Sequence, residues 1–145
     1  MTEATGLAEI RPAGMLDTCV VIDLASYGST VQLPEDSRVS AVSFAELSYG
    51  VALARTPTVA AARSQALAAL RTWLTPLPFD WRAADKYGEL AALVVAAGRH
   101  HRPRRFDLMI AATAIVNDLP LYTANADDFH GLEPVLDIRP VTRPS

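Results

Sequence analysis

The sequence predicts an α/β fold in which a central, mainly parallel sheet of four to five strands is flanked by helices on both faces. Short apolar runs of strand length alternate with longer segments of helical periodicity along the chain. Strands joined through a helix form right-handed crossovers, which place helices on both faces of a parallel sheet. The length of 145 residues suits one domain with one sheet, so three layers are expected.

The first third of the chain is predicted to contain two strands, each followed by a helix. Residues 13–16 form an apolar run that ends at Asp17, and the apolar residues after it suit one or two helical turns. Residues 38–42 are the second strand candidate. Ser43 and Glu46 match the S-x-x-E capping box, in which each side chain bonds a free backbone amide, so a helix is expected to begin there.

The middle of the chain is predicted to form a pair of helices. Pro57 breaks the preceding helix, and the alanine-rich residues 59–74 carry leucines along one stripe. A short extended piece follows at residues 77–79. Asp80 then resembles the N-cap of a second helix, and Gly98 suits the left-handed position that ends it.

The last third returns to alternating helix and strand. Residues 107–117 are almost all apolar, which predicts a helix buried on most sides. Residues 121–123 form a short strand, residues 125–129 turn, and residues 135–139 form the last strand. These elements complete a sheet of four to five strands.

One domain is expected, from residue 15 to residue 141, without a repeat or an internal linker. Residues 1–14 show no periodicity, so they are expected to be a flexible leader or a mis-annotated start, with Met15 as the alternative first residue. Residues 142–145 are expected to be a short tail.

Composition excludes several classes of protein. Half of the residues are apolar and 20% are charged, which is unlike a disordered chain. Cys19 is the only cysteine, so no internal disulfide can form, and a reducing cytoplasm is the expected location. Apolar runs are shorter than the roughly 20 residues of a membrane helix, so no membrane association is expected.

The charge distribution leaves nucleic-acid binding open. A formal net charge of −3 argues against general affinity for phosphate backbones. Between residues 99 and 105, however, the chain carries two histidines and four arginines, whose planar guanidinium groups match pairs of phosphate oxygens. This basic loop is either an RNA contact or an ordinary solvated loop; its arginines are Arg99, Arg102, Arg104 and Arg105.

Acidic residues follow the ends of the predicted strands. Asp17 follows the first strand, Glu46 lies early in the helix after the second, and Asp107 opens the buried helix. Asp127 and Asp128 come soon after the strand at residues 121–123. Ligands of open parallel sheets bind beyond the carboxyl ends of the strands, and carboxylates gathered there repel one another unless a cation neutralises them. Oxygen ligands favour Mg²⁺ or Mn²⁺ over zinc.

Each acid also has a purely structural explanation. Glu46 could complete a capping box, and Asp107 could cap its helix and interact with the helix dipole. Asp17 is the strongest functional candidate, because it lies between an apolar strand and an apolar helix, where an unpartnered carboxylate is costly to bury.

Other chemistries have weaker support. Cys19 has no histidine near it in the sequence and is expected to be a small buried residue, and the adjacent His100 and His101 cannot share a helix face as zinc ligands do. Glycine-rich phosphate loops are missing from the sequence. Four aromatic residues in the middle of the chain are expected on the core faces of helices or strands rather than on a base-stacking surface: Trp73, Phe79, Trp81 and Tyr87.

Four segments in this order closely resemble the PIN-domain ribonucleases of the VapC toxin type. They are residues 16–24 (LDTCVVIDL), 41–50 (AVSFAELSYG), 106–114 (FDLMIAATA) and 121–129 (LYTANADDF). The resemblance covers about residues 15–141, and four ordered motifs are more specific than any one of them. It implies a PIN-like three-layer fold.

The resemblance also implies a function. Such proteins are Mg²⁺- or Mn²⁺-dependent endoribonucleases that cleave structured RNA and inhibit translation until a VapB-like antitoxin neutralises them. They are usually homodimers, and DNA is reached only indirectly, through the antitoxin. The metal-binding and catalytic acids would be Asp17, Glu46, Asp107 and Asp128, with polar support from Thr18, Thr123, Asn125 and Asp127. Cys19 stands where the family often has Asn or Ser, and the doublet Asp127 and Asp128 leaves the fourth ligand open.

Two alternatives belong to other classes. A catalytically silent module could keep the PIN fold and bind RNA or a partner protein. A phospho-acceptor signalling domain would also place acids at strand ends, but it requires a lysine near the last strands, and the only lysine is Lys86.

Overall fold

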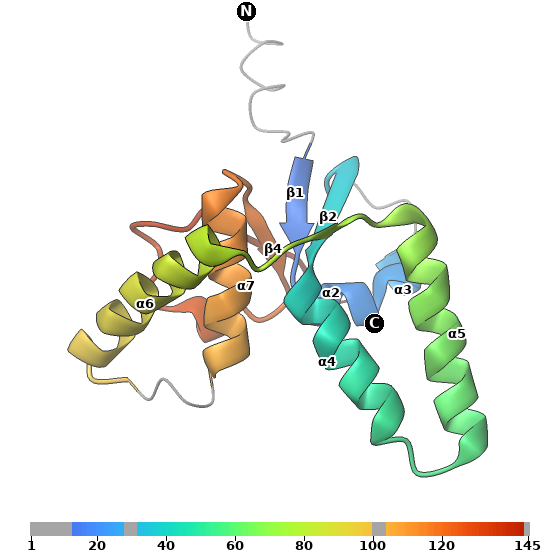
Figure 1. The fold of residues 1–145 in the computed structure, drawn as a ribbon. Coiled ribbons are helices and arrows are strands. Elements are labelled where there is room, and N and C mark those ends of the chain that lie inside the picture. The colour runs from blue at the N-terminus through green and yellow to red at the C-terminus, as the bar shows by residue number, and fades with distance from the viewer. Residues whose placement is uncertain (1–12, 28–31, 100–103, 144–145) are drawn as a thin grey trace, which may run out of the picture.

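A five-stranded sheet with every strand parallel lies at the centre of the computed structural model, which describes residues 13–27, 32–99 and 104–143 (Figure 1). The strand order is β3-β2-β1-β4-β5. The predicted α/β class and the parallel sheet are therefore confirmed. The strands are β1 (Ala13–Leu16), β2 (Asp36–Ser40), β3 (Pro76–Leu77), β4 (Leu121–Thr123) and β5 (Ile138–Pro140).

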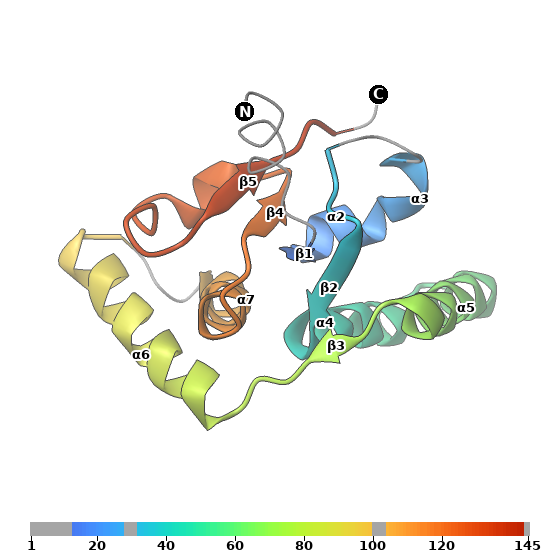
Figure 2. The same cartoon turned by 90° about the horizontal axis from the view of Figure 1, so that it is seen from above.

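Helices cover both faces of the sheet (Figure 2). Successive residues of a strand point to opposite faces, and in β1 Met15 joins the hydrophobic cluster formed with α6 and α7, whereas Leu16 joins the cluster formed with α2 and α3. Two cores on two faces make the three layers that the sequence predicts. The helical segments are α2 (Thr18–Ile22), α3 (Leu24–Tyr27), α4 (Ala41–Ala52), α5 (Pro57–Trp73), α6 (Trp81–Ala96), α7 (Arg105–Val116) and the 3₁₀ helix η2 (Ala126–Phe129).

The start of α4 corrects the sequence analysis. The N-cap is Ser40, whose hydroxyl accepts a hydrogen bond from the backbone N–H of Val42 at 3.0 Å. The predicted capping box of Ser43 and Glu46 is therefore wrong, because a capping residue three positions earlier ends the strand and begins the helix. Ser43 and Glu46 lie inside the helix, and their side chains are free for other contacts.

Other helix ends follow the sequence prediction. Asp80 caps α6, with Oδ1 accepting from the N–H of Ala83 at 3.1 Å, and Gly98 has a φ of 73° just beyond the end of that helix. Pro57 is the first residue of α5, where its missing N–H costs nothing. The last strand begins later than predicted, since the N–H groups of Val135 and Leu136 both bond the carbonyl of Leu132 in a turn.

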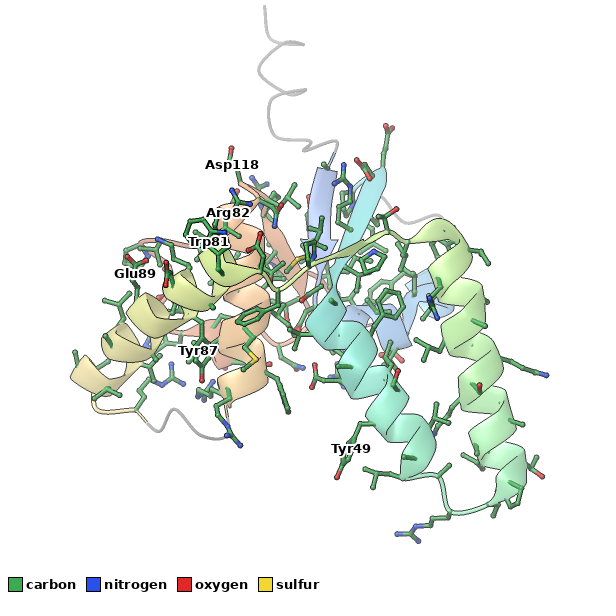
Figure 3. The ribbon with its side chains drawn as sticks, viewed as in Figure 1. Tyr49, Trp81, Arg82, Tyr87, Glu89 and Asp118 are labelled. Atoms are coloured by element: carbon green, nitrogen blue, oxygen red, sulfur yellow. The ribbon has the colours of Figure 1, made fainter. Side chains whose placement is uncertain are left out.

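The tryptophans were predicted in the core, and this is wrong for both. Trp73 is 60% exposed and Trp81 is 73% exposed. Trp81 is labelled in Figure 3. Phe79 and Tyr87 pack edge to face with ring centroids 6.4 Å apart, as expected of core aromatics. The tryptophans lie at the last and first positions of α5 and α6, beyond the faces that these helices bury.

Gly14 is required by the close approach of β1 to its neighbours. A Cβ at this position would lie 2.5 Å from the ring of Tyr122 and 3.1 Å from Pro34. We therefore expect Gly14→Ala to lower the free energy of unfolding by about 1–3 kcal/mol, the usual cost of overpacking. Gly88→Ala is the matched control, since Gly88 is exposed on α6 and a Cβ there meets nothing within 4 Å, so the substitution should stabilise by about 0.4–1 kcal/mol. Urea denaturation measures both, and equal stabilities would contradict the packing argument.

Within the residues that the structure describes, no helix has the length and hydropathy needed to span a membrane.

Candidate functional site

The candidate site lies at the carboxyl edge of the sheet, where the chain leaves β1. The strand order places β2 on one side of β1 and β4 on the other. The strand order therefore changes direction at β1. In parallel sheets such a switch opens a crevice between the helices that follow the two neighbouring strands. Asp17 comes directly after β1, and Thr123 is the last residue of β4. The backbone N–H of Asp17 donates to the carbonyl of Tyr122 at 2.9 Å, which ties the two strand ends together.

Asp17 is the most buried acid of the site. Its side chain is 4% exposed, and its Oδ1 accepts from the N–H of Thr18 at 2.9 Å, as an N-cap of α2. Its Oδ2 accepts from Thr123 Oγ1 at 2.8 Å and from Cys19 Sγ at 3.4 Å. Burial raises the pKa of Asp17 despite these hydrogen bonds. Its carboxylate is thus fixed in place and poorly solvated.

Glu46 is joined to the first residue of α2 through the hydroxyl group of Thr18. Thr18 Oγ1 donates to Glu46 Oε1 at 2.7 Å and lies 2.8 Å from Ser43 Oγ. Because Thr18 uses its hydroxyl proton on Glu46, the Ser43 hydroxyl is the donor in the second contact. Burial raises the pKa of Glu46. Sequence reasoning missed this role of Ser43; the signal was its position one turn before Glu46 on the same helix.

Asp107 is the electrostatic centre of the site. It lies in the first turn of α7, and its pKa is raised from an ordinary value of 3.8 to about 7. Burial is the largest cause, and the charges of Asp17, Asp128 and Glu46 add to it. Arg104 acts in the opposite direction. These interactions show that four acids predicted from the sequence share one electrostatic field.

The two adjacent aspartates after β4, Asp127 and Asp128, differ in their surroundings. The charge of Asp128 raises the pKa of Asp17 and of Asp107, whereas Asp127 is exposed to solvent. Asp128 is therefore the better candidate for the fourth acid. Asn125 supports the site through its backbone, since its N–H donates to Thr123 Oγ1 at 3.0 Å while its side-chain amide lies beside Arg143.

Cys19 differs from the simple buried residue that the sequence predicts. It is half-buried, and its Sγ lies 3.8 Å from Thr123 Oγ1 besides donating to Asp17. Burial and the charge of Asp17 raise the pKa of the thiol, so it keeps its proton and acts as a hydrogen-bond donor. The thiol is thus a weak donor beside the carboxylate of Asp17.

Two arginines of the predicted basic loop contact the protein itself. Arg104 Nη1 donates to the backbone carbonyl of Asp128 at 2.6 Å, and Arg99 Nη1 donates to the carbonyl of His130. Arg105 is exposed, and Arg102 lies outside the described residues. Their contact with RNA stays a prediction.

The residues present fit a hard divalent cation by their chemistry. In the described part of the chain, no three acidic, histidine or cysteine side chains already stand together as a ready ligand group. The four acids offer only oxygen atoms, which suits Mg²⁺ or Mn²⁺ rather than zinc. The buried carboxylate of Asp17 and the raised pKa of Asp107 are the features that a bound cation would offset.

Comparisons with known proteins agree with this geometry. Residues 15–132 match the model of the PIN domain family. A member of the VapBC family of toxin–antitoxin systems, VapBC-5 from Mycobacterium tuberculosis, has a similar fold with a TM-score of 0.73 and 32% sequence identity, over 92% of this chain and 100% of that one. Among proteins with curated descriptions, no sequence match was found.

Two further solved structures have a similar fold. FitAcB from Neisseria gonorrhoeae matches with a TM-score of 0.70 and 25% identity over 90% of this chain and 96% of that one. VapBC-1 from nontypeable Haemophilus influenzae matches with a TM-score of 0.69 and 22% identity, over 88% and 97% of the two chains. From the family match over most of its length and from these structures, the chain belongs to the PIN-domain family and is similar in fold to the VapC components of toxin–antitoxin complexes.

Proposed function

We propose that this PIN domain is a Mg²⁺- or Mn²⁺-dependent endoribonuclease toxin of the VapC type. The observation that carries the proposal is the coupling of the acids, which raises the pKa of Asp107 to about 7 through burial and three carboxylate charges. Perturbed acids in a crevice at a sheet edge are typical of catalytic centres. The family match and the VapBC structures support the toxin class.

The four acids would hold the divalent ion. When bound, the ion supplies Lewis-acid activation of water and offsets the charge that grows on the phosphate oxygens during hydrolysis. Thr123, Cys19 and the N–H of Thr18 fix the carboxylate of Asp17. Phosphodiester hydrolysis by this route requires no side-chain nucleophile, which agrees with the protonated thiol of Cys19.

The activity is tested by incubating the protein with structured RNA and Mg²⁺ or Mn²⁺, with and without chelator. We expect internal cleavage that depends on the ion and stops in chelator. Transfer, ribosomal and messenger RNA are tried separately, because folded RNA is selected by its shape and its unstacked loops. Binding of these RNAs without cleavage would instead favour a catalytically silent PIN-fold module.

An antitoxin is the proposed regulator of the site. An apolar groove of about 460 Å³ runs between α2, α4 and α5, with Val21, Leu67 and Leu70 in its walls and Glu46 at its edge. An apolar segment of a VapB-like antitoxin would bury this surface and block access to the acids. We further propose a cytoplasmic homodimer that contacts DNA only through the antitoxin.

We expect Leu67→Asp to weaken antitoxin binding, because it places a charge in the apolar wall of the groove. The test uses the antitoxin that the proposal expects a small neighbouring gene to encode, co-expressed and co-purified with this chain. Ala84→Asp, at an exposed position of α6, is the matched control and should co-purify as well as the wild type. Loss of binding by both variants, or by neither, would contradict docking in the groove.

A further inference from the structure

Two arginines hold the chain segment that carries Asp128. Arg104 directly precedes α7, and its Nη1 donates to the backbone carbonyl of Asp128 at 2.6 Å. Arg99 follows the end of α6, and its Nη1 donates to the carbonyl of His130, two residues further along. Residues 128–130, at the end of η2, are therefore bound by one arginine just after α6 and by another just before α7.

The backbone of this segment is held by local hydrogen bonds and by one buried side chain. The N–H of Asp128 donates to the carbonyl of Asn125, and the N–H of His130 donates to the carbonyl of Asp127. Phe129 is fully buried in the core, and the segment packs against α7 and β5. These contacts hold the backbone and Phe129, whereas the carboxylate of Asp128 is partly exposed, so a side-chain contact is needed to fix its position.

Arg104 supplies this contact and faces a second acid. Its Nη1 lies 3.9 Å from Asp128 Oδ1, and its side chain is 25% exposed, so its charge is only partly screened. Its charge also lowers the pKa of Asp107, against the three carboxylates that raise it. Arg104 is the N-cap of α7, and Asp107 lies in the first turn of the same helix. One cation thus acts on acids from two elements.

We propose that Arg104 is a positioning residue, which fixes Asp128 beside Asp107 and completes the four-acid site, while Arg99 holds the same segment from α6. This inference rests on the proposed function, since it assigns the metal site its fourth acid. It changes the expected role of Arg104, because a guanidinium that donates to a protein carbonyl has fewer donors left for an RNA phosphate. The partly exposed Asp128 otherwise lacks a side-chain partner among the described residues.

Arg104→Ala, Arg104→Lys and the neighbouring Arg105→Ala test the proposal in the full chain. Mn²⁺ affinity is measured by calorimetric titration, and hydrogen–deuterium exchange of residues 126–132 is measured without metal. We expect Arg104→Ala to weaken Mn²⁺ binding about 10–100-fold, as loss of a residue that supports a ligand does. Exchange in the segment should accelerate. The lysine variant should lose less, and Arg105→Ala should change neither measurement, because Arg105 is exposed.

The exchange measurement separates this proposal from the proposed function. Wild-type protein that binds no Mn²⁺ would contradict the metal-dependent function, while faster exchange in Arg104→Ala would still support the positioning role. Unchanged Mn²⁺ affinity and unchanged exchange in Arg104→Ala would overturn it. If that variant also bound RNA more weakly, with a smaller salt dependence, Arg104 would be a phosphate contact.

Discussion

Asp17→Asn is expected to lower metal-dependent RNA cleavage at least a thousandfold. The substitution keeps the shape of the side chain and removes its charge, and the lost electrostatic stabilisation of several kcal/mol corresponds to roughly 10³-fold or more in kcat/KM. The new amide also presents donors, whereas Thr123, Cys19 and the N–H of Thr18 all donate to the present carboxylate. Cleavage of end-labelled RNA at saturating Mn²⁺ measures the effect.

The fold of this variant is expected to survive. A buried neutral amide costs less to desolvate than a buried carboxylate, which offsets the hydrogen bonds that the amide loses, so the melting temperature in chelator should be similar. Asp118→Asn is the matched control, because Asp118 is exposed at the opposite edge of the sheet, before β4 begins (Figure 3). Cleavage at the same rate by Asp17→Asn and Asp118→Asn would remove the enzymatic proposal.

Asp107→Asn is expected to reduce the pH dependence of stability in the metal-free protein. The pKa of Asp107 is about 7 in the folded protein against an ordinary value of 3.8, so the folded state binds the proton more tightly than the unfolded state does. The stability that Asp107 contributes is fully present below the ordinary pKa of 3.8, and it is lost as the pH rises through the folded-state pKa of about 7. The wild type should therefore melt at a lower temperature at about pH 8 than at about pH 5.

Thermal melting in chelator across this pH range measures the effect. Asp107→Asn should show a flatter profile and, near pH 8, a melting temperature at or above that of the wild type. Added Mn²⁺ should stabilise the wild type but not the variant, because ion binding favours the folded state in proportion to its affinity. A large loss of stability in chelator would instead show that Asp107 serves mainly as a helix residue near the N-terminal dipole.

The backbone of the site could be predicted from the sequence because its signals are local. The apolar run at residues 13–16 and the acid after it predicted both β1 and the place of Asp17. The strand at residues 121–123 was likewise predicted at its observed bounds. The carboxyl ends of parallel strands lie along one edge of the sheet. Acids that follow these ends in the sequence were therefore predicted to lie near one another.

The side-chain contacts could not be predicted, because they join residues far apart in sequence. Thr123 donates to Asp17 across 106 positions, and Arg104 reaches the carbonyl of Asp128 across 24. Glu46 stays a predicted site acid, although the capping box used to explain its place is wrong. The real cap at Ser40 leaves Glu46 free to accept from Thr18, a contact that depends on how α4 packs beside β1.

Anomalous diffraction from a crystal soaked in Mn²⁺ tests the central claim most directly. The account predicts a strong peak bound by carboxylate oxygens of Asp17 and Asp107, with Glu46 and Asp128 around it, and loss of that peak in Asp107→Asn. A fully soaked wild-type crystal with no manganese between these four side chains would contradict it.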